Sequence, residues 1–304
     1  MDKILKNKKF VDIKEVHFTP EFKRGLQDIF GEEMAKKAEK VSKKVRGFQF
    51  TYLSKNGKIS GLLSVPKISG VEKMPCIIYN RGGNMDFSTL RPGALFKNLG
   101  FLAAEGYVVM ASQYSGNSLS EGKDEFGGKD LDDVVALYDI LKTLPMADIK
   151  RIGVYGASRG GMMTFLLMKK VKWLKAACVK SGLYDLISNA KLRPKMKEVF
   201  KECFGGSKKE MINRSVSYWA NELPKNVPVL MMHGSADWRT SALDALEVSK
   251  RFIECGVPHR LTLFEGADHL LSEFSKEEQE MTIAWFEKYL KNRQPLPNLE
   301  PHGK

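Results

Sequence analysis

One serine of the chain stands in a setting that could make its hydroxyl a nucleophile. The segment 156–160 reads GASRG, so Ser158 has a glycine two residues to either side. An apolar run, residues 151–155, precedes the segment, and a helical pattern follows over residues 162–168. A serine at a sharp strand-to-helix turn occupies strained backbone that only small flanking residues tolerate. The pattern predicts a nucleophile at the end of a strand.

A serine hydroxyl attacks well only when a base takes its proton, so a histidine and an orienting carboxylate are expected later in the chain. The chain has five histidines. His17 and His302 lie near the termini, and His259 begins an apolar strand. His233 and His269 remain as candidates for the base.

Two loops that follow apolar strands supply the candidate partners. His269 comes shortly after residues 261–264, and Asp237 comes shortly after residues 227–232. Functional loops of a parallel sheet gather at the carboxyl ends of its strands, where Ser158 is also expected. We assign Ser158 as the nucleophile, His269 as the general base and then acid, and Asp237 as the carboxylate that orients the imidazole.

Asp268 is a rival for the role of Asp237, but adjacent side chains in a loop seldom face one another, so we favour Asp237. His233 is interpreted as structural, with its imidazole bonded to loop backbone. Together with His269, these residues could be drawn as metal ligands, but there is no HExxH motif, and the serine would then lack an explanation. Because nicotinamide and flavin fingerprints are also missing, we expect no metal and no other cofactor.

From residue 75 onward, short apolar runs alternate with amphipathic helical stretches. Helical spacing recurs at Leu95, Leu99 and Leu102, and again between Val134 and Leu144. The apolar runs are residues 76–79, 107–111, 152–155, 176–179, 227–232 and 261–264. Apolar strands that alternate with helices indicate an α/β fold with a mostly parallel sheet covered by helices on both faces.

We divide the chain into three parts. Residues 1–46 are a charged, partly helical leader, residues 47–293 are the main domain, and residues 294–304 are a tail. Within the main domain, residues 183–226 hold no convincing strand and are expected to form a helical, cap-like insertion.

Local signals mark several boundaries. Asn56-Gly57 predicts a type I′ turn in a hairpin formed by residues 47–54 and 58–65. Ser275-x-x-Glu278 is typical of a capping box that opens a helix. In the leader, large apolar residues recur every four positions and could pack on the domain or on a second subunit of a homo-oligomer; they are Phe18, Phe22, Leu26 and Phe30.

The net charge of +13 is concentrated in two segments. Residues 1–46 hold 13 basic and 8 acidic side chains, and residues 169–214 hold 13 and 4. No RGG run, recognition-helix pattern or interleaved aromatic residues accompany them, so we expect neither nucleic acid nor a membrane as a partner. The charge is interpreted as a solvated lysine-rich surface. Steering of anionic substrates by residues 169–214 is the alternative.

The remaining composition describes an ordinary globular chain of 304 residues, of which 43% are hydrophobic. The N-terminus lacks the apolar stretch of a secretory signal, and no apolar run approaches the roughly 20 residues of a membrane-spanning helix. The four cysteines form no CxxC pair. We expect a cytoplasmic enzyme.

Several segments resemble the α/β-hydrolase fold, and within it the catalytic domain of the prolyl oligopeptidase family of serine peptidases. The resemblance spans roughly residues 47–293, and its most specific parts are the motifs around Ser158, Asp237 and His269. The similar segments are residues 77–83, 107–116, 130–144, 156–161, 232–237 and 266–269. The resemblance implies that the main domain is an α/β-hydrolase catalytic domain. Members of this family typically carry a β-propeller before that domain, and we expect none here because only 46 residues precede the hairpin.

Besides the missing propeller, the sequence departs from the family pattern at the oxyanion hole, which needs two hydrogen-bond donors. The resemblance implies that the backbone N–H of Arg159 is one of them. Proline-cleaving relatives use a tyrosine hydroxyl as the other, but Arg81 stands at that position here. We therefore expect a backbone donor from Gly82 or Gly83. Arg81 either binds a substrate carboxylate or forms a salt bridge, and we favour the salt bridge.

Three apolar residues beside Ser158 or in the insertion are candidates for the substrate pocket: Met162, Tyr184 and Trp219. The sequence as a whole predicts a serine hydrolase that cleaves small ester or peptide substrates through an acyl-enzyme, with a leaning to peptidase. The alternatives are a short-chain carboxylesterase or deacetylase of the same fold, and a protein of this fold that binds a ligand without turnover.

Overall fold

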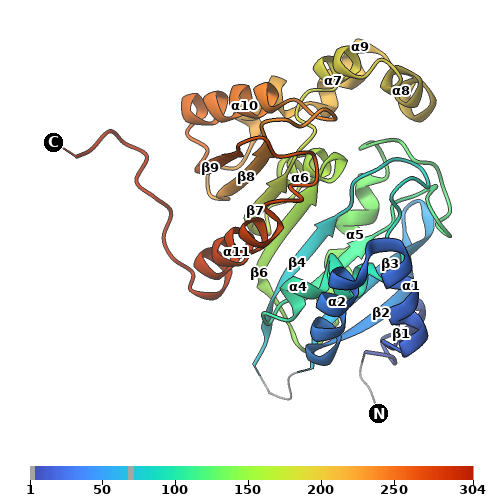
Figure 1. Cartoon of the computed structure of the whole chain (residues 1–304). Helices are drawn as coiled ribbons and strands as arrows, with labels where there is room; N and C mark the ends of the chain where they lie inside the picture. The colour runs from blue at the N-terminus through green and yellow to red at the C-terminus, as the bar shows by residue number, and fades with distance from the viewer. Residues whose placement is uncertain (1–3, 68–71, 304) are drawn as a thin grey trace. The chain divides into compact units, whose positions relative to one another are not determined.

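Nine strands form one sheet, in the order β1-β2-β3-β5-β4-β6-β7-β8-β9, in a computed structural model that describes residues 4–67 and 72–303 (Figure 1). The mostly parallel sheet with its helices confirms the predicted α/β class. By its internal contacts the chain divides into two compact units. The first comprises residues 1–124 and 129–152, and the second comprises residues 125–128 and 153–304. The predicted limits at residues 46 and 293 stay predictions.

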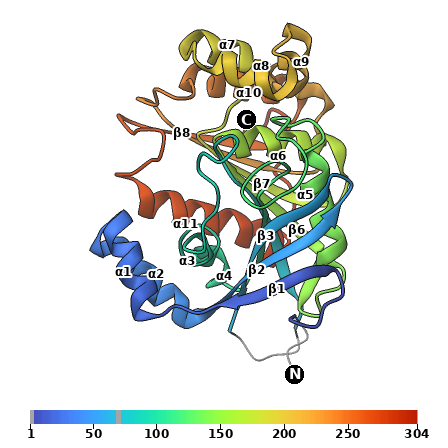
Figure 2. The same cartoon turned by 90° about the vertical axis from the view of Figure 1, so that its right-hand side faces the viewer.

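The first unit places helices on both faces of its strands. Leu95 lies against Gly47, whereas the Tyr52 hydroxyl donates a hydrogen bond to the Asp133 carbonyl. Residues 47 and 52 point to opposite faces because side chains alternate along a strand. Helix α5 accordingly lies across the strands from α2 and α3 (Figure 2). The elements are β1 (Phe10–Val16), α1 (Pro20–Phe30), α2 (Glu32–Lys44), β2 (Val45–Ser54), β3 (Gly57–Pro66), β4 (Met74–Asn80), α3 (Ala94–Lys97), α4 (Gly100–Ala103), β5 (Val108–Ser112) and α5 (Leu131–Leu141).

The second unit begins within β6 (Ala147–Ala157) and repeats this layering. Val179 faces Gly161 of α6, and its neighbour Cys178 contacts Thr282 of α11 on the other face. Strands β7, β8 and β9 are parallel. The elements are α6 (Arg159–Lys170), β7 (Leu174–Lys180), β8 (Val229–Gly234), α10 (Ala242–Cys255), β9 (His259–Phe264), α11 (Ser275–Phe286) and the π-helical turn η3 (Glu287–Lys291).

Residues 183–226 are helical, and the structure has no strand among them. Helices α7 (Leu186–Leu192), α8 (Met196–Phe204) and α9 (Lys208–Arg214) lie together in both views (Figures 1 and 2). The 3₁₀ turns η1 (Val216–Tyr218) and η2 (Ala220–Glu222) follow them and pack on α10. Across residues 4–67 and 72–303, no helix combines the length and the apolar character needed to cross a bilayer.

Three local predictions differ from the structure. The hairpin is present, but only Gly57 has a positive φ (108°), so the type I′ turn is wrong. Asn56 instead bonds to Lys129 and Asp133 of a neighbouring segment. The capping box is also wrong, because Phe274 is the N-cap of α11 and no side chain caps this helix. Strand β1 was not predicted, because its burial is irregular and its register slips near Phe10.

The leader packs on its own unit. The rings of Phe18 and Phe22 lie 5.3 Å and 5.7 Å from the ring of Phe96 on α3. Leu26 is buried and approaches Gly93. Helix packing within the chain therefore accounts for most of the four-residue repeat, whereas Phe30 remains exposed.

Glu278 does not cap the helix because its carboxylate is bonded to side chains of the sheet. The side chain is 2% exposed and accepts hydrogen bonds from the Tyr155 hydroxyl (2.8 Å) and the Lys180 ammonium group (3.2 Å). These partners lie on β6 and β7, the two strands that end beside Ser158. One buried carboxylate thus ties α11 to both strands.

We expect Glu278→Gln to lower the free energy of unfolding by about 1–3 kcal/mol, because a neutral amide leaves the Lys180 ammonium group poorly paired. Urea denaturation with an unchanged m value would measure the loss. Glu280→Gln on the exposed side of the same helix is the matched control and should stay within about 0.5 kcal/mol. Equal stability of the two variants would contradict the role given to Glu278.

The raised pKa of Asp244 on α10 predicts that the stability of the protein depends on pH. Burial raises the pKa of Asp244 to about 6, and the nearby Asp185 carboxylate adds to the rise against a hydrogen bond from Ser188. The folded state therefore favours the protonated acid, so stability should fall as pH rises from about 4 to about 6. Asp244→Asn should remove this fall, which melting temperatures across that range would show. A variant that follows the wild-type curve would exclude Asp244 as the cause, and the exposed Asp139→Asn is the control.

Candidate active site

Ser158 lies at the junction of β6 and α6. Its φ of 57° and ψ of −122° fall in a region that residues other than glycine rarely adopt. A Cβ on Gly156 would come within 2.1 Å of the Gly160 carbonyl oxygen, and one on Gly161 would come within 2.7 Å of a Val179 methyl group. The glycines therefore allow the sharp turn that holds Ser158 at the end of the strand.

The segment after β7 supports this turn through its backbone. The Ser158 N–H donates to the Lys180 carbonyl (2.9 Å), and the Leu183 N–H donates to the Ser158 carbonyl (3.1 Å). Between them, the Ser181 N–H donates to the Met232 carbonyl at the end of β8 (2.8 Å). The strained turn is thus bonded on both sides of Ser158 and connected to the next strand.

The loop after β8 buries the carboxylate of Asp237 among donors. Its Oδ1 accepts the backbone N–H groups of Arg239 (2.8 Å) and Thr240 (3.1 Å), as in an Asx turn. Its Oδ2 accepts the Thr240 hydroxyl (2.7 Å). The same hydroxyl oxygen lies 3.2 Å from the Ser181 carbonyl oxygen, which links this loop to the segment behind Ser158.

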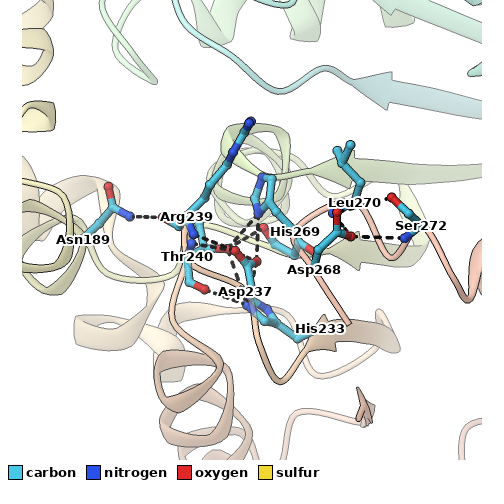
Figure 3. Close-up of polar contacts among 10 residues, drawn as sticks. Asn189, His233, Asp237, Arg239, Thr240, Asp268, His269, Leu270 and Ser272 are labelled. Atoms are coloured by element: carbon cyan, nitrogen blue, oxygen red, sulfur yellow. Dashed lines mark hydrogen bonds and ion pairs between the residues drawn. The ribbon is translucent and has the colours of Figure 1, made fainter. Parts of the chain in front are cut away.

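His269 reaches Asp237 from the loop after β9. Its Nδ1 lies 2.8 Å from Asp237 Oδ2, and both side chains are buried (Figure 3). A carboxylate can only accept, so Nδ1 carries the proton and Nε2 is left as a base. The structure therefore brings His269 and Asp237 together, two of the three residues that the sequence singles out. The third, Ser158, lies at the end of β6.

The charge of Asp237 depends on these donors. Burial opposes ionisation, but hydrogen bonds from His233 and His269 outweigh it, and the pKa of Asp237 lies well below its usual range. Asp237 is consequently a carboxylate at any pH where the protein would be studied. A fixed negative charge at this place accepts the Nδ1–H of His269 and so holds the orientation of its imidazole.

His233 contributes more than its predicted structural role. As expected, it bonds to loop backbone, because its Nε2 lies 3.1 Å from the Thr240 carbonyl oxygen. The same nitrogen also lies 3.3 Å from Asp237 Oδ2, and both side chains are fully buried. Since both neighbours are acceptors, Nε2 carries the proton. Sequence reasoning missed this second contact and the role of Thr240, although Thr240 stands only three residues after Asp237.

Asp268, the rival carboxylate, serves its own loop. It accepts the backbone N–H groups of Leu270 (2.9 Å) and Ser272 (3.1 Å), and Figure 3 shows it turned toward them. Within residues 4–67 and 72–303, no group of three or more His, Cys, Asp or Glu side chains is placed to hold a metal ion.

Arg81 lies in the first unit with its guanidinium buried and bonded to protein acceptors. Nε donates to the Gln113 carbonyl, and the two Nη atoms donate to Asn117 and to three carbonyls of the segment 82–87. These contacts match the five N–H donors of arginine. The structure thus gives Arg81 a role as the scaffold of its own loop, a third possibility beside the two that the sequence raised.

The residues expected in the oxyanion hole belong to both units. Gly82 and Gly83 lie in the Arg81 loop of the first unit, where Gly83 has a φ of 76° and a Cβ would meet the Phe87 carbonyl oxygen at 2.1 Å. Arg159 opens α6 in the second unit, at the end of a helix where backbone N–H groups point outward. Its side chain is buried against the Phe126 ring, 4.4 Å from the centroid.

The three residues expected in the substrate pocket are all buried in the second unit. Met162 lies on α6 near Gly127. Tyr184 lies between the rings of Phe165 and His233. Trp219 donates its indole N–H to the Ile212 carbonyl (3.1 Å). Their contacts with substrate stay predictions.

The sheet, the strained serine turn and the loops after β8 and β9 define a member of the α/β-hydrolase fold. The model of the prolyl oligopeptidase family matches residues 94–293, and the chain belongs to this family of serine peptidases. The resemblance predicted from the sequence is thereby confirmed.

Known relatives share this assignment. The chain is 27% identical over 257 residues to an uncharacterized peptidase, YtmA, of Bacillus subtilis, covering 83% of this chain and 96% of the relative. It is 27% identical over 220 residues to dipeptidyl-peptidase 5 of Porphyromonas gingivalis, covering 67% and 31%. Among solved structures, the acylaminoacyl peptidase of Pyrococcus horikoshii has a TM-score of 0.71 at 20% identity, covering 82% of this chain and 42% of that one. The last likeness shows the fold alone.

We expect His233 and Asp237 to stabilise the protein as a coupled pair. His233→Phe and Asp237→Asn should each destabilise it, and the double variant should lose about 1–3 kcal/mol less than the sum of the two, because each single change already breaks the shared hydrogen bond. Urea unfolding at neutral pH measures all three variants. His259→Phe is the control, because His259 bonds to Ser249 on α10. The losses of unfolding free energy caused by His259→Phe and Asp237→Asn should simply add. If the losses of unfolding free energy also added simply for His233→Phe and Asp237→Asn, the coupling of His233 to Asp237 would be contradicted.

Proposed function

We propose that this chain hydrolyses amide bonds of peptide substrates through an acyl-enzyme, with Ser158 as nucleophile, His269 as base and Asp237 as the orienting carboxylate. The observation that carries the proposal is the buried 2.8 Å contact between His269 Nδ1 and Asp237 Oδ2. It leaves Nε2 of a well-oriented imidazole to act on a serine at an elbow turn of the same sheet edge.

The chemistry follows from these atoms. His269 Nε2 takes the hydroxyl proton while Ser158 Oγ bonds to the carbonyl carbon of the substrate. The resulting imidazolium returns its proton to the leaving amine, the C–N bond breaks, and the acyl group stays on Oγ. Water then attacks the ester by the same route and frees the acid. Asp237 supports both steps, because its charge stabilises the imidazolium and its position fixes the tautomer.

The oxyanion needs donors that are already aligned. We propose the Arg159 N–H as one donor and the N–H of Gly82 or Gly83 as the other. The amino-terminal end of α6 favours negative charge at Arg159. The Arg81 guanidinium supports the second donor by holding the carbonyls of its own loop. Loss of one oxyanion donor typically costs about 3–4 kcal/mol of transition-state stabilisation.

The names of the relatives favour peptides over esters. YtmA and the Porphyromonas gingivalis protein are both called peptidases. Met162, Tyr184 and Trp219 are our candidates for the walls of the substrate pocket, given their place beside α6 and in the insertion. A short-chain carboxylesterase or deacetylase would use the same three catalytic residues, and a ligand-binding protein without turnover would have no use for a strained Ser158.

We expect Ser158→Ala to lower kcat by at least about 10⁴-fold, because the nucleophile is removed while the binding surface remains. The measurement is kcat/KM on matched nitrophenyl esters and peptidyl anilides. Turnover of anilides that depends on Ser158 supports the peptidase, whereas turnover of short esters alone would make the protein an esterase. Ser275→Ala, at the start of α11, is the control and should keep full activity. Equal rates for the wild type and Ser158→Ala on every substrate would refute the triad.

A further inference from the structure

An exposed tryptophan stands beside the catalytic carboxylate between two arginines. Trp238 directly follows Asp237 and is 60% exposed. The Arg239 guanidinium carbon lies 5.1 Å from the centroid of its ring, and that of Arg193 lies 5.2 Å from it. Arg193 comes from the end of α7 in the insertion, so two segments distant in the sequence meet on one indole.

Hydrogen bonds fix the backbone of both arginines. The Arg239 N–H is bonded to Asp237 Oδ1, and the Arg239 carbonyl accepts the side-chain amide of Asn189 (2.7 Å; Figure 3). Asn189 is buried, and its own carbonyl accepts the Arg193 N–H (2.8 Å). One residue of α7 therefore sets the positions of both arginines relative to the loop of Asp237. In Figure 3 the Arg239 side chain leaves this network and points away from Asp237.

Neither guanidinium forms an ion pair with a carboxylate of the described residues. Among residues 4–67 and 72–303, no carboxylate oxygen lies within 4.0 Å of a guanidinium nitrogen of Arg193 or Arg239. Burial lowers the pKa of Arg193 and repulsion from Arg239 adds to this effect, whereas attraction to the Asp237 carboxylate opposes it. Four other arginines form ion pairs with acids: Arg46 with Glu15, Arg151 with Asp148, Arg214 with Glu210 and Arg251 with Glu247.

Two guanidinium groups that form no ion pair lie against one exposed indole, and together they could bind a planar anion. Guanidinium binds carboxylate through two parallel hydrogen bonds, and the ring orients the cations by stacking. The segment 169–214, which holds 13 basic and 4 acidic side chains, adds a favourable field for an anionic molecule. The place beside Asp237 puts such a receptor next to the reacting groups.

We propose that Arg193, Trp238 and Arg239 form a subsite that binds a carboxylate of the substrate near the scissile bond, so that the enzyme prefers acidic peptides. The inference rests on the proposed function and names its substrate class. The carboxylate belongs to the substrate itself, as an acidic side chain or a free C-terminus, and is distinct from a free anion that would regulate the enzyme.

Peptidyl anilides and short peptides in matched Glu and Gln pairs test this subsite. The pairs carry the acidic residue at each of the positions around the scissile bond, and a further pair compares a free with an amidated C-terminus. In the wild type, one pair should show about tenfold higher kcat/KM for the acidic member at low salt, and high salt should reduce the ratio. The double variant Arg193→Gln/Arg239→Gln should bring that ratio close to one, and Arg193→Glu should bring it lower still.

Controls separate this proposal from its rivals. Arg260→Gln removes another arginine near a tryptophan, Trp285, and should leave the ratio unchanged. A wild-type ratio near one for every pair, or a ratio that survives in the double variant, overturns the subsite. Acetate that alters turnover of the neutral substrates in the wild type but not in the double variant would assign the site to a free anion and also overturn it.

Binding to Ser158→Ala separates failure of the subsite from failure of the proposed function. Calorimetry should find tighter binding of the acidic peptide to Ser158→Ala than of its neutral partner, and the double variant in that background should lose the difference. This result would support the subsite even if no Ser158-dependent turnover were found. Equal binding of both peptides, with turnover intact, would reject the subsite alone.

Discussion

The buried carboxylate of Asp237 is the constraint around which the second unit is organised. A carboxylate without water must be surrounded by donors, since an uncompensated buried charge is strongly destabilising. Here backbone N–H groups and the Thr240 hydroxyl come from its own loop, and two imidazoles come from the end of β8 and from the loop after β9. Satisfying one charge therefore fixes three segments, one of which carries His269.

The turn at Ser158 adds a second constraint of a different kind. Its backbone is strained, so the surrounding structure must hold it in place. Close approach at Gly156 and hydrogen bonds to the segment 180–183 do so. Because Thr240 also contacts the Ser181 carbonyl, the support of the serine and the support of Asp237 share a residue. The buried Glu278 of α11 also bonds to β6 and β7, the strands that end beside Ser158.

The helical insertion links this common framework to features particular to the chain. Asn189 of α7 holds the loop of Asp237 through the Arg239 carbonyl, and Arg193 reaches the same loop through the Trp238 ring. A segment without any catalytic residue can therefore influence both the position of the carboxylate and the charge of its surroundings. Family membership establishes the framework, whereas such local contacts distinguish one member from another.

Local sequence patterns identify most of the strands and the three candidate catalytic residues. Continuous apolar runs identify buried parallel strands, and the glycines around Ser158 identify a turn whose sterics are purely local. Asp237 and His269 could be chosen because both follow such strands. Each of these inferences depends on neighbours along the chain, and local sequence is sufficient for that.

The partners of buried polar side chains, in contrast, depend on contacts between segments that are distant in sequence. Glu278 stands in a capping box by sequence, but Tyr155 and Lys180 bind its carboxylate more than 90 residues away. Asn56 suits a type I′ turn, yet it bonds to the segment that holds Lys129 and Asp133. Arg81 and Arg193 likewise take roles set by groups farther along the chain, namely Gln113 and Asn117 for Arg81 and Trp238 for Arg193. A buried polar group must satisfy its hydrogen bonds wherever the fold supplies a partner, and local pattern carries no record of that choice.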